Sequence, residues 1–249
     1  MCRFSVETTA ESAKFLIMKL PTIILAAVSA LFWLGQQLHA QSNVDTNKLA
    51  EIRAKAEKGD VQAECDLGSA YAFSKFGLKQ DWTNAMVWFR KAAEQNNAEA
   101  ECRLGTGYDF GVGLEKNLPE ALKWYQKSAD QNFVEAYWRL GCNCDGSDAV
   151  KWFSKAADQN FIPAQGYLAG CYYRGRGVEK DLVEAYKWYL MVDEASPYHD
   201  DHYPGQWANF MSGLKASLSP EQIAEAKRRV AEWRAQHNKV PPNIGAPKS

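Results

Sequence analysis

The chain has 249 residues, of which 46% are hydrophobic and 12% aromatic, and its formal net charge is −1. This composition is typical of a globular protein of one or two domains and excludes a wholly disordered chain. Nucleic-acid binders need clustered Lys and Arg to neutralise phosphates, and no such cluster is present, so we expect no nucleic-acid partner.

Residues 1–40 are predicted to be a signal peptide. A 12-residue, mainly apolar run, Ile23 to Leu34, is followed by a polar stretch that ends at Ala40. Such a run is too short to cross a hydrocarbon core of about 30 Å. Cleavage after Ala40 would give a periplasmic or secreted chain without stable membrane insertion, and an uncleaved anchor is the alternative.

The segment ahead of this run has acidic residues at Glu7 and Glu11, where a signal peptide has basic ones. Met18, followed directly by Lys19, gives a better start. We therefore expect translation to begin at Met18.

An internal repeat dominates the rest of the sequence. Four copies of a two-part pattern occur, and each part begins with alanine. The first parts begin at Ala63, Ala100, Ala136 and Ala164, and the second parts begin at Ala85, Ala121, Ala149 and Ala185.

Each part has the spacing of an amphipathic helix. Counted from Ala100, apolar or small residues recur at +4, +5 and +8, on one face of a helix that turns by about 100° per residue. Glycine at +5, such as Gly105, disfavours a helix, so we expect a neighbouring helix to approach closely there. The recurring tryptophans of the second helices share such a stripe and are predicted to be core residues: Trp88, Trp124, Trp152 and Trp188.

The residues between these helices support the boundaries. Asp81, Asn117 and Asp181 stand four residues before the second-helix alanines, as N-caps do. Gly59, Asn96, Asn132 and Asn160 follow second helices, where a left-handed residue is favoured. Glycine-rich turns separate the two helices at 111–117 and 175–181, and glycine suits the positive φ of such turns.

The pattern A-x-x-x-L-G-x-x-Y, then G-x-G-V, then A-x-x-W-Y-x-K-A-A, resembles the Sel-one-like repeats, which are related to tetratricopeptide repeats. The resemblance covers residues 63–195 and implies an all-α, α/α superhelical solenoid, here in an exported bacterial-type member. It further implies a non-enzymatic scaffold for a protein or peptide partner, with no cofactor. The oligomeric state stays open.

The segments beside the repeats are assigned from their composition. Residues 41–62 are predicted to hold the second helix of a partial leading repeat, and residues 196–238 a loop and C-terminal capping helices. Ser219 is the expected N-cap of the last helix, with Gln222 at its third position. The proline-containing tail, residues 239–249, is expected to be disordered.

The third repeat is shortened at 141–148. The same count of four from Ala149 gives Asp145 as its N-cap, so the missing residues, about eight, are the last turns of the first helix and the glycine turn. Cys142 and Cys144 then lie in a short interhelical turn.

The inner, concave side of the solenoid is the expected binding surface, because first helices line it in such folds. Positions +2, +6 and +9 of the first helices lie opposite the buried leucine at +4. Trp138 and Tyr173 are the expected anchors, since aromatic residues concentrate binding energy. This prediction covers Ser69, Thr106, Asp109, Trp138 and Tyr173, and extends to Cys65, Ala72, Cys102, Gly166 and Gly170.

Two alternative functions, metal binding and β-lactam binding or hydrolysis, stay open. His199 and His202, with two aspartates between them, could bind a metal ion in an envelope protein. Ser212 and Lys215 form an S-x-x-K match, and some cysteine-rich relatives bind or hydrolyse β-lactams. However, no S-D-N or K-T-G motif accompanies the match, and the repeats lack the paired cysteines of those relatives, so we expect no enzyme.

The cysteines are candidates for disulfide bonds, because an exported chain can form them. The five cysteines after residue 40 are an odd number, so at least one is free or pairs between chains. The shortened turn should lie beside the first helix of the last repeat. We therefore expect Cys171 to bridge to Cys142 or Cys144.

Overall fold

The computed structural model describes residues 45–195 and 206–237. The predicted signal peptide, the His199 and His202 segment and the C-terminal tail lie outside these residues. The described residues form helices and turns without a strand, and they belong to two compact units, 45–81 and 82–237. Each unit is described by itself.

The first unit contains a helix over residues 45–56, then α2 (Val61–Ala72) and the short 3-10 helix η1 (Lys75–Gly77). The Asp60 side chain caps α2 by accepting from the Ala63 N–H at 2.8 Å. Ser74 and Phe76 both have φ of 55°, a left-handed conformation that favours glycine. The corresponding turns of the second and fourth repeats place glycines at such positions.

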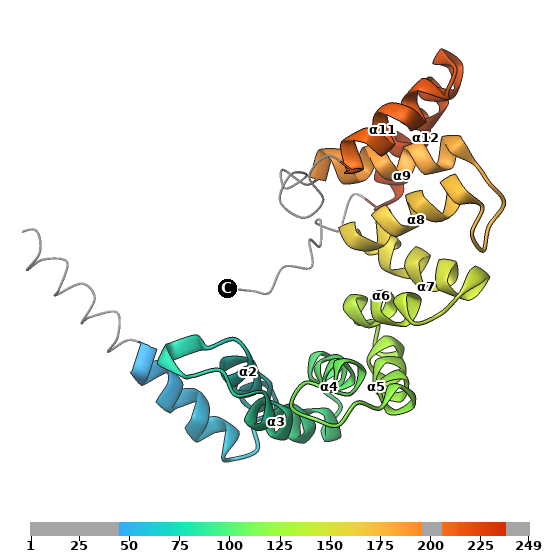
Figure 1. Ribbon diagram of the computed structural model, residues 1–249. Coiled ribbons are helices and arrows are strands. Elements are labelled where there is room, and N and C mark those ends of the chain that lie inside the picture. The colour runs from blue at the N-terminus through green and yellow to red at the C-terminus, as the bar shows by residue number, and fades with distance from the viewer. Residues whose placement is uncertain (1–44, 196–205, 238–249) are drawn as a thin grey trace, which may run out of the picture. The chain divides into compact units, whose positions relative to one another are not determined.

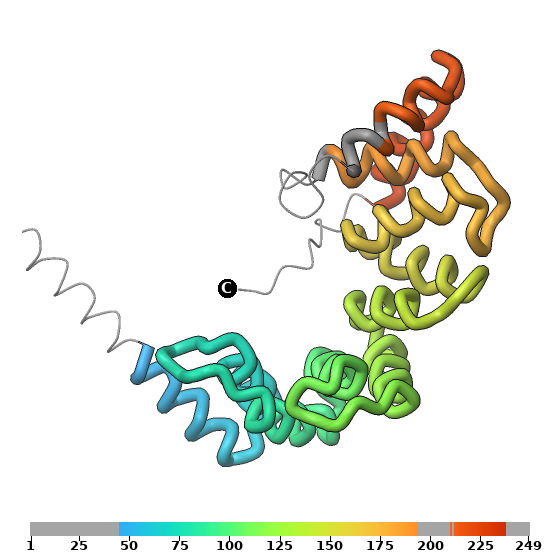
Figure 2. Tube along the Cα trace, viewed as in Figure 1, coloured from blue at the N-terminus to red at the C-terminus, as the bar shows by residue number. Residues whose placement is uncertain are grey.

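The second unit is a stack of antiparallel helix pairs, in which consecutive helices pack on one another (Figure 1). Its helices are α3 (Trp82–Glu94), α4 (Ala98–Phe110), α5 (Leu118–Asp130), α6 (Val134–Cys142), α7 (Gly146–Asp158), α8 (Ile162–Arg174) and α9 (Leu182–Ala195), then α11 (Gln206–Ala216) and α12 (Pro220–His237). Within this unit the first helices α4, α6 and α8 follow one another on the same side (Figure 2). The predicted α/α solenoid fold is confirmed.

The predicted helix ends are confirmed where their contacts are resolved. Asn117 accepts from the Glu120 N–H at 3.1 Å, and Asp181 accepts from the Glu184 N–H at 2.9 Å. Asn96, Asn132 and Asn160 have φ of 62°, 62° and 59°. These asparagines end the second helices in the left-handed conformation that the sequence predicted.

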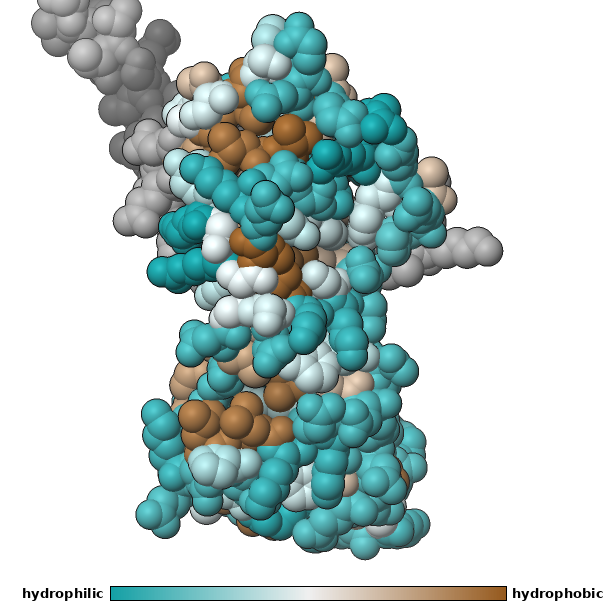
Figure 3. Space-filling view, turned by 90° about the vertical axis from the view of Figure 1, so that its right-hand side faces the viewer, coloured by the Kyte–Doolittle hydropathy of each residue, from teal (hydrophilic) through white to brown (hydrophobic). Residues whose placement is uncertain are grey.

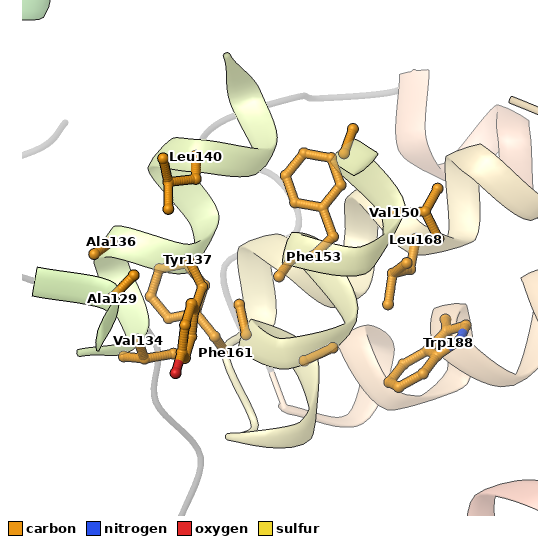
Figure 4. Close-up of a cluster of buried hydrophobic side chains, with 14 of the residues drawn as sticks. Ala129, Val134, Ala136, Tyr137, Leu140, Val150, Phe153, Phe161, Leu168 and Trp188 are labelled. Carbon is orange, nitrogen blue, oxygen red and sulfur yellow. The ribbon is translucent and has the colours of Figure 1, made fainter. Parts of the chain in front are cut away.

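The core is built on the aromatic residue that follows each recurring tryptophan. Tyr125 is fully buried and Phe153 is 3% exposed. A Cβ added to Gly105 would lie 2.7 Å from the Tyr125 ring, and one added to Gly141 would lie 2.6 Å from the Phe153 ring. The predicted close approach at glycine is therefore confirmed, and Figure 4 shows Phe153 among the buried side chains.

The tryptophans themselves correct the prediction that all four are core residues. Trp188 is 5% exposed, whereas Trp88, Trp124 and Trp152 are only half-buried. A lysine of the same helix covers each ring, for example Lys127 at 4.1 Å from the Trp124 ring centroid. The tryptophan thus lies at the edge of the core, where a cation can reach its face.

The third repeat is short, as predicted. Its first helix, α6, has 9 residues, whereas α4 and α8 have 13 each. Asp145 precedes α7 as the N-cap, although its side chain makes no capping hydrogen bond. Cys142 is the last residue of α6, which corrects its predicted place in the turn, whereas Cys144 lies in the turn as predicted. The turn of residues 143–145 replaces the glycine-rich turn of the second and fourth repeats.

The helix α12 packs against α9 at the C-terminal end of the repeats. Ser219 and Gln222 cap it reciprocally, with the Gln222 side chain 2.9 Å from the Ser219 N–H. The Arg229 guanidinium donates to Asp181 at 3.2 Å and to Glu184 at 3.0 Å. Over the described ranges, no helix is long and apolar enough to cross a membrane.

Candidate functional site

Three residues predicted on the open surface are buried, which corrects the sequence prediction for them. At position +2 of the first helices, Cys65 is 1% exposed and Cys102 is fully buried, and Ala72 at +9 is also fully buried. Trp138 and Gly166, the other residues at +2, are half-buried. In the second unit the reason is that α4 packs on both α3 and α5. A first helix with two neighbours leaves only a narrow strip to solvent, and that strip is not directly opposite the buried leucine.

The strip that is exposed to solvent lies beside the predicted one, further round the helix axis. Counted from the first-helix alanine, positions −1, +3, +6 and +10 fall at about 240° to 300° on the helix, at about 100° per residue. We call the strip on α4, α6 and α8 the first-helix face. It includes Glu99, Arg103, Thr106 and Phe110 on α4, Glu135, Arg139 and Cys142 on α6, and Tyr167 and Gly170 on α8.

Thr106 and Asp109, two of the predicted contact residues, are half-buried and join neighbouring helices. The Tyr125 hydroxyl donates to Asp109 Oδ2 at 3.2 Å and lies 3.4 Å from Thr106 Oγ1. Asn143, at the end of α6, donates to the same Asp109 oxygen at 3.3 Å. Burial raises the pKa of Tyr125, so this hydroxyl stays protonated and can donate. Both residues therefore contribute to the stack, and their contact with a partner stays a prediction.

Trp138 and Tyr173, the predicted anchors, are half-buried and take part in internal packing. The Trp138 ring lies 6.0 Å from Phe161 and packs on the large core cluster. The Tyr173 ring meets Phe210 of α11 edge-on, at 4.6 Å. Tyr173 therefore belongs to the contact with the C-terminal helices. Ser69 is half-buried on α2, in the first unit.

Phe110 and Tyr167 are the exposed aromatic residues of the first-helix face, and the sequence prediction missed both. Phe110 is 58% exposed and Tyr167 is 50% exposed. The Arg139 guanidinium lies 5.6 Å from the Phe110 ring centroid, and the Tyr167 ring stacks on Phe153 at 5.0 Å. Their positions, +10 and +3, would have identified them if the strip had been centred at about 270°.

Four charged residues run along the same face as a ladder of ion pairs. Arg103 lies 3.4 Å from Glu99 and 3.7 Å from Glu135, and Arg139 lies 3.3 Å from Glu135. Burial alone would lower the pKa of Arg103, but the two carboxylates raise it. The ladder is balanced in charge, and it holds both guanidinium groups in place, that of Arg139 beside the exposed Phe110 ring.

Cys142 at the end of α6, Cys144 in the shortened turn and Cys171 on α8 are free thiols. Cys142 is exposed, whereas Cys144 and Cys171 are half-buried against the same core cluster. Although Cys142 is exposed as a residue, partial desolvation of its thiol raises the pKa to about 11, so little thiolate forms at neutral pH. The pairing of Cys171 with Cys142 or Cys144 stays a prediction.

The structure describes only some of the residues that the sequence suggested for catalysis or metal binding. Ser212 and Lys215 are both exposed on α11, and His199 and His202 lie outside the described residues. In the part of the chain that the structure describes, no group of three or more His, Cys, Asp or Glu side chains is arranged to hold a metal ion. The first-helix face combines two exposed aromatic rings with arginines that ion pairs hold in place.

The family model described as Sel1 repeat matches four consecutive segments of the chain, residues 61–97, 98–133, 134–161 and 162–191. No match is found among the curated proteins. These segments agree with the four repeats read from the sequence, including the short third one.

Two solved structures show the same fold. One is a protective antigen present in uropathogenic Escherichia coli strains and displaying an SLR fold, with a TM-score of 0.68 and 24% identity over 81% of this chain. This chain covers 45% of that protein. The other is a Sel1 repeat protein from Oxalobacter formigenes, with a TM-score of 0.61, 27% identity and 78% of each chain covered.

Proposed function

Because this chain belongs to the Sel1 repeat family, we propose that it is an exported, non-enzymatic scaffold that binds a protein or peptide partner on its first-helix face. Sel1 repeat proteins generally mediate protein–protein interaction.

The exposure of Phe110 and Tyr167 on the first helices carries the proposal. Large aromatic side chains that are about half exposed offer apolar area to a partner, and aromatic and arginine residues dominate the energy of interfaces. Arg139 lies beside Phe110 and is held by Glu135, so a partner would find its guanidinium already oriented. A bound peptide would therefore lose little energy in ordering this surface.

The test measures the affinity of a partner isolated from an envelope extract for purified variants. We expect the double variant Phe110→Ser, Tyr167→Ser to bind at least about tenfold more weakly, since each ring would lose its contacts. Val87→Ser is the matched control, because Val87 is 49% exposed on the second helix α3. Equal affinities for the wild type and the double variant would contradict the proposal.

The absence of catalysis is part of the same proposal. Its support is the chain's membership of a family that generally serves as a scaffold. Turnover of nitrocefin that is lost in Ser212→Ala would instead favour the β-lactam alternative. A bound metal ion in the purified, untagged protein would favour the metal-binding alternative.

Export rests on the sequence of residues 1–40. We expect the mature protein to begin at Gln41, in the periplasm or outside the cell. N-terminal sequencing and the intact mass of the mature protein test this directly. A mature chain that retains the apolar run Ile23 to Leu34 would indicate the uncleaved anchor, and one that begins at Met1 would contradict the start at Met18.

A further inference from the structure

Two arginines of the first-helix face stand at the same repeat position, +3, but differ in their partners. Arg103 on α4 pairs with Glu99 of its own helix at 3.4 Å and with Glu135 of the next first helix at 3.7 Å. Arg139 on α6 pairs with Glu135 of its own helix at 3.3 Å. Among the described residues, no other carboxylate lies within ion-pair distance of Arg139. Arg139 therefore has one carboxylate where Arg103 has two.

The sequence explains why Arg139 lacks a second carboxylate. Glu99 and Glu135 occupy position −1 of α4 and α6, whereas Pro163 occupies this position on α8. Proline suits the first turn of a helix, but its side chain carries no charge. The ladder of ion pairs therefore ends on a guanidinium group with N–H donors that Glu135 does not use.

A second unmatched cation lies on α8. Arg174 occupies position +10 of the first-helix face, is exposed, and makes no ion pair with a described residue. Its guanidinium lies back along the helix over Gly170, since a Cβ added to Gly170 would be 3.7 Å from Arg174 Nη1. Gly170 follows the exposed Tyr167 by three residues, about 4.5 Å along the helix axis. The cation and the aromatic ring are therefore neighbours on one strip.

The charges of the first-helix face are consequently unequal. On this face α4 and α6 each carry one glutamate and one arginine, whereas α8 carries Arg174 alone. The face has an excess of positive charge, although the whole chain has a net charge of −1. Hydrophobic residues gather in separate patches on a mainly hydrophilic surface, as Figure 3 shows for one side of the molecule. A partner segment suited to such a surface combines charged with apolar residues.

We propose that the partner segment on the first-helix face is acidic, with carboxylates that pair with Arg139 and Arg174 and an apolar side chain that packs on Tyr167. This inference rests on the proposed function and names the chemistry of its partner. A carboxylate suits a guanidinium group because two oxygens can accept from two N–H donors. At Arg139 the partner's carboxylate would take the part that Glu135 plays for Arg103.

The two arginines should contribute unequally. The Arg139 side chain is 19% exposed, and its guanidinium lies 4.7 Å from the Trp138 ring centroid. It is therefore held in place before a partner binds, and little conformational freedom is lost on binding. Arg174 is more exposed, so solvent and salt weaken any ion pair that it forms. We expect most of the electrostatic affinity to come from Arg139.

The test adds synthetic peptides to the isotope-labelled chain of residues 41–249, and the backbone amide NMR signals of α6 and α8 report binding. The acidic probe is acetyl-GEFEFG-amide, and two matched probes replace both of its glutamates by glutamine or by lysine. We expect saturable shifts with the acidic peptide at up to millimolar concentration, about tenfold weaker binding of the glutamine peptide and none of the lysine peptide. Equal binding of the acidic and glutamine peptides, or no shift with the acidic one, would overturn the proposal.

A substitution at Pro163 supplies the missing carboxylate from within the chain. Pro163→Glu places it where Glu135 stands relative to Arg103, at the start of a helix, where an acidic residue is favoured. We expect this variant to bind the acidic peptide about tenfold more weakly than Pro163→Gln, the uncharged control of the same size. Equal affinities of these two variants would refute the pairing of the peptide with Arg139.

A second pair of variants tests the contribution of α8. Arg174→Gln and Lys123→Gln each remove one exposed positive charge, the first from the first-helix face and the second from the second helix α5. We expect Arg174→Gln to weaken binding of the acidic peptide about threefold, and Lys123→Gln to leave it unchanged. Equal losses would show that the overall charge attracts the peptide, and would overturn the proposal.

The same variants separate this inference from the proposed function. If the partner isolated from an envelope extract binds more weakly to Phe110→Ser, Tyr167→Ser but equally to Pro163→Glu and Pro163→Gln, the proposed function stands and the acidic segment is refuted. If the double variant binds that partner as the wild type does, the proposed function is refuted and this inference fails with it.

Discussion

The second and third repeats share a core but differ in what closes it. In both, an aromatic residue of the second helix fills the space above a glycine of the first helix, Tyr125 above Gly105 and Phe153 above Gly141. The second repeat adds a glycine turn that reaches the preceding repeat, and the third has none. The contact between the glycine and the aromatic ring therefore defines the folded unit, whereas the turn is an accessory that can be lost.

The largest expected effect comes from removing the shared contact in the short repeat. Phe153→Ala should lower the free energy of unfolding by about 3–5 kcal/mol, as removal of a buried aromatic ring does. Tyr125→Ala is the matched change in the complete repeat and should cost at least as much, since it also removes a hydrogen bond to Asp109. Urea denaturation measures both. A loss below about 1 kcal/mol for Phe153→Ala would mean that the third repeat is held together differently.

A second pair of substitutions separates two effects of the glycine turn. One is its contact with the preceding repeat, and the other is the strain of a side chain at positive φ. Gly177→Ala should cost about 2–4 kcal/mol, because the new Cβ would meet the Gly146 oxygen and φ is positive. Gly146→Ala also has positive φ, 60°, but nothing lies within 4 Å of its Cβ, so only about 1 kcal/mol should be lost. Thermal and urea midpoints report the difference. Equal losses would show that the contact with the preceding repeat contributes nothing.

Completing the third repeat should have a smaller and opposite effect. Replacement of residues 141–144 by residues 105–116 restores the missing turn, and we expect the new turn to pack near the exposed Leu118 at the start of α5. We expect a gain of about 1 kcal/mol, because buried apolar area stabilises more than the longer turn costs in entropy. The control adds Leu118→Ser to this variant, and we expect this substitution to reduce the gain in stability. A lower denaturation midpoint than that of the wild type would show that the missing turn of the third repeat is not a defect in packing.

The smallest effect concerns a buried charge that the second repeat has and the fourth lacks. Glu101 is 1% exposed and accepts from Gln131 at 2.7 Å, whereas Gln165 occupies its place in the fourth repeat. Burial raises the pKa of Glu101 above 4.5, although the hydrogen bond from Gln131 opposes the shift. The folded state therefore holds its proton to a higher pH than the unfolded state does, and stability falls as pH rises through that interval.

Glu101→Gln should consequently be slightly more stable than the wild type at pH 7. The difference should disappear below pH 4.5, the ordinary pKa of the group, where both states of the wild type are protonated. Denaturation curves at a series of pH values measure this. A difference that grows toward low pH would contradict the assignment of the buried charge.

The sequence predicted the fold because its signals are local. Asn117 as a cap, Asn132 as a left-handed helix end and Gly105 as a point of close approach each follow from one helix and its neighbours in the chain. The short third repeat was also visible, since the count from Ala149 to its cap does not depend on the missing turn.

The interaction surface was harder to predict because exposure depends on how many neighbours a helix has. A single amphipathic stripe places Cys102 on the open side, but α4 packs on two helices and buries it fully. Trp138 was predicted as an anchor from the same stripe; it is half-buried, and its contact with a partner stays a prediction. Phe110 and Tyr167 were missed because the predicted open strip was not centred on their positions, and residue type alone does not distinguish an exposed aromatic residue from a buried one.

The position of α12 determines how long the stack can become. A repeat array can in principle extend by adding another first helix to the last second helix, and the apolar side of α9 would accept one from a neighbouring molecule. α12 takes that place, with Trp233 against Trp188 at 6.1 Å between ring centroids and Arg229 paired to Asp181 and Glu184. Deletion of α12 would therefore expose the apolar side of α9. We expect such molecules to associate head to tail and to polymerise.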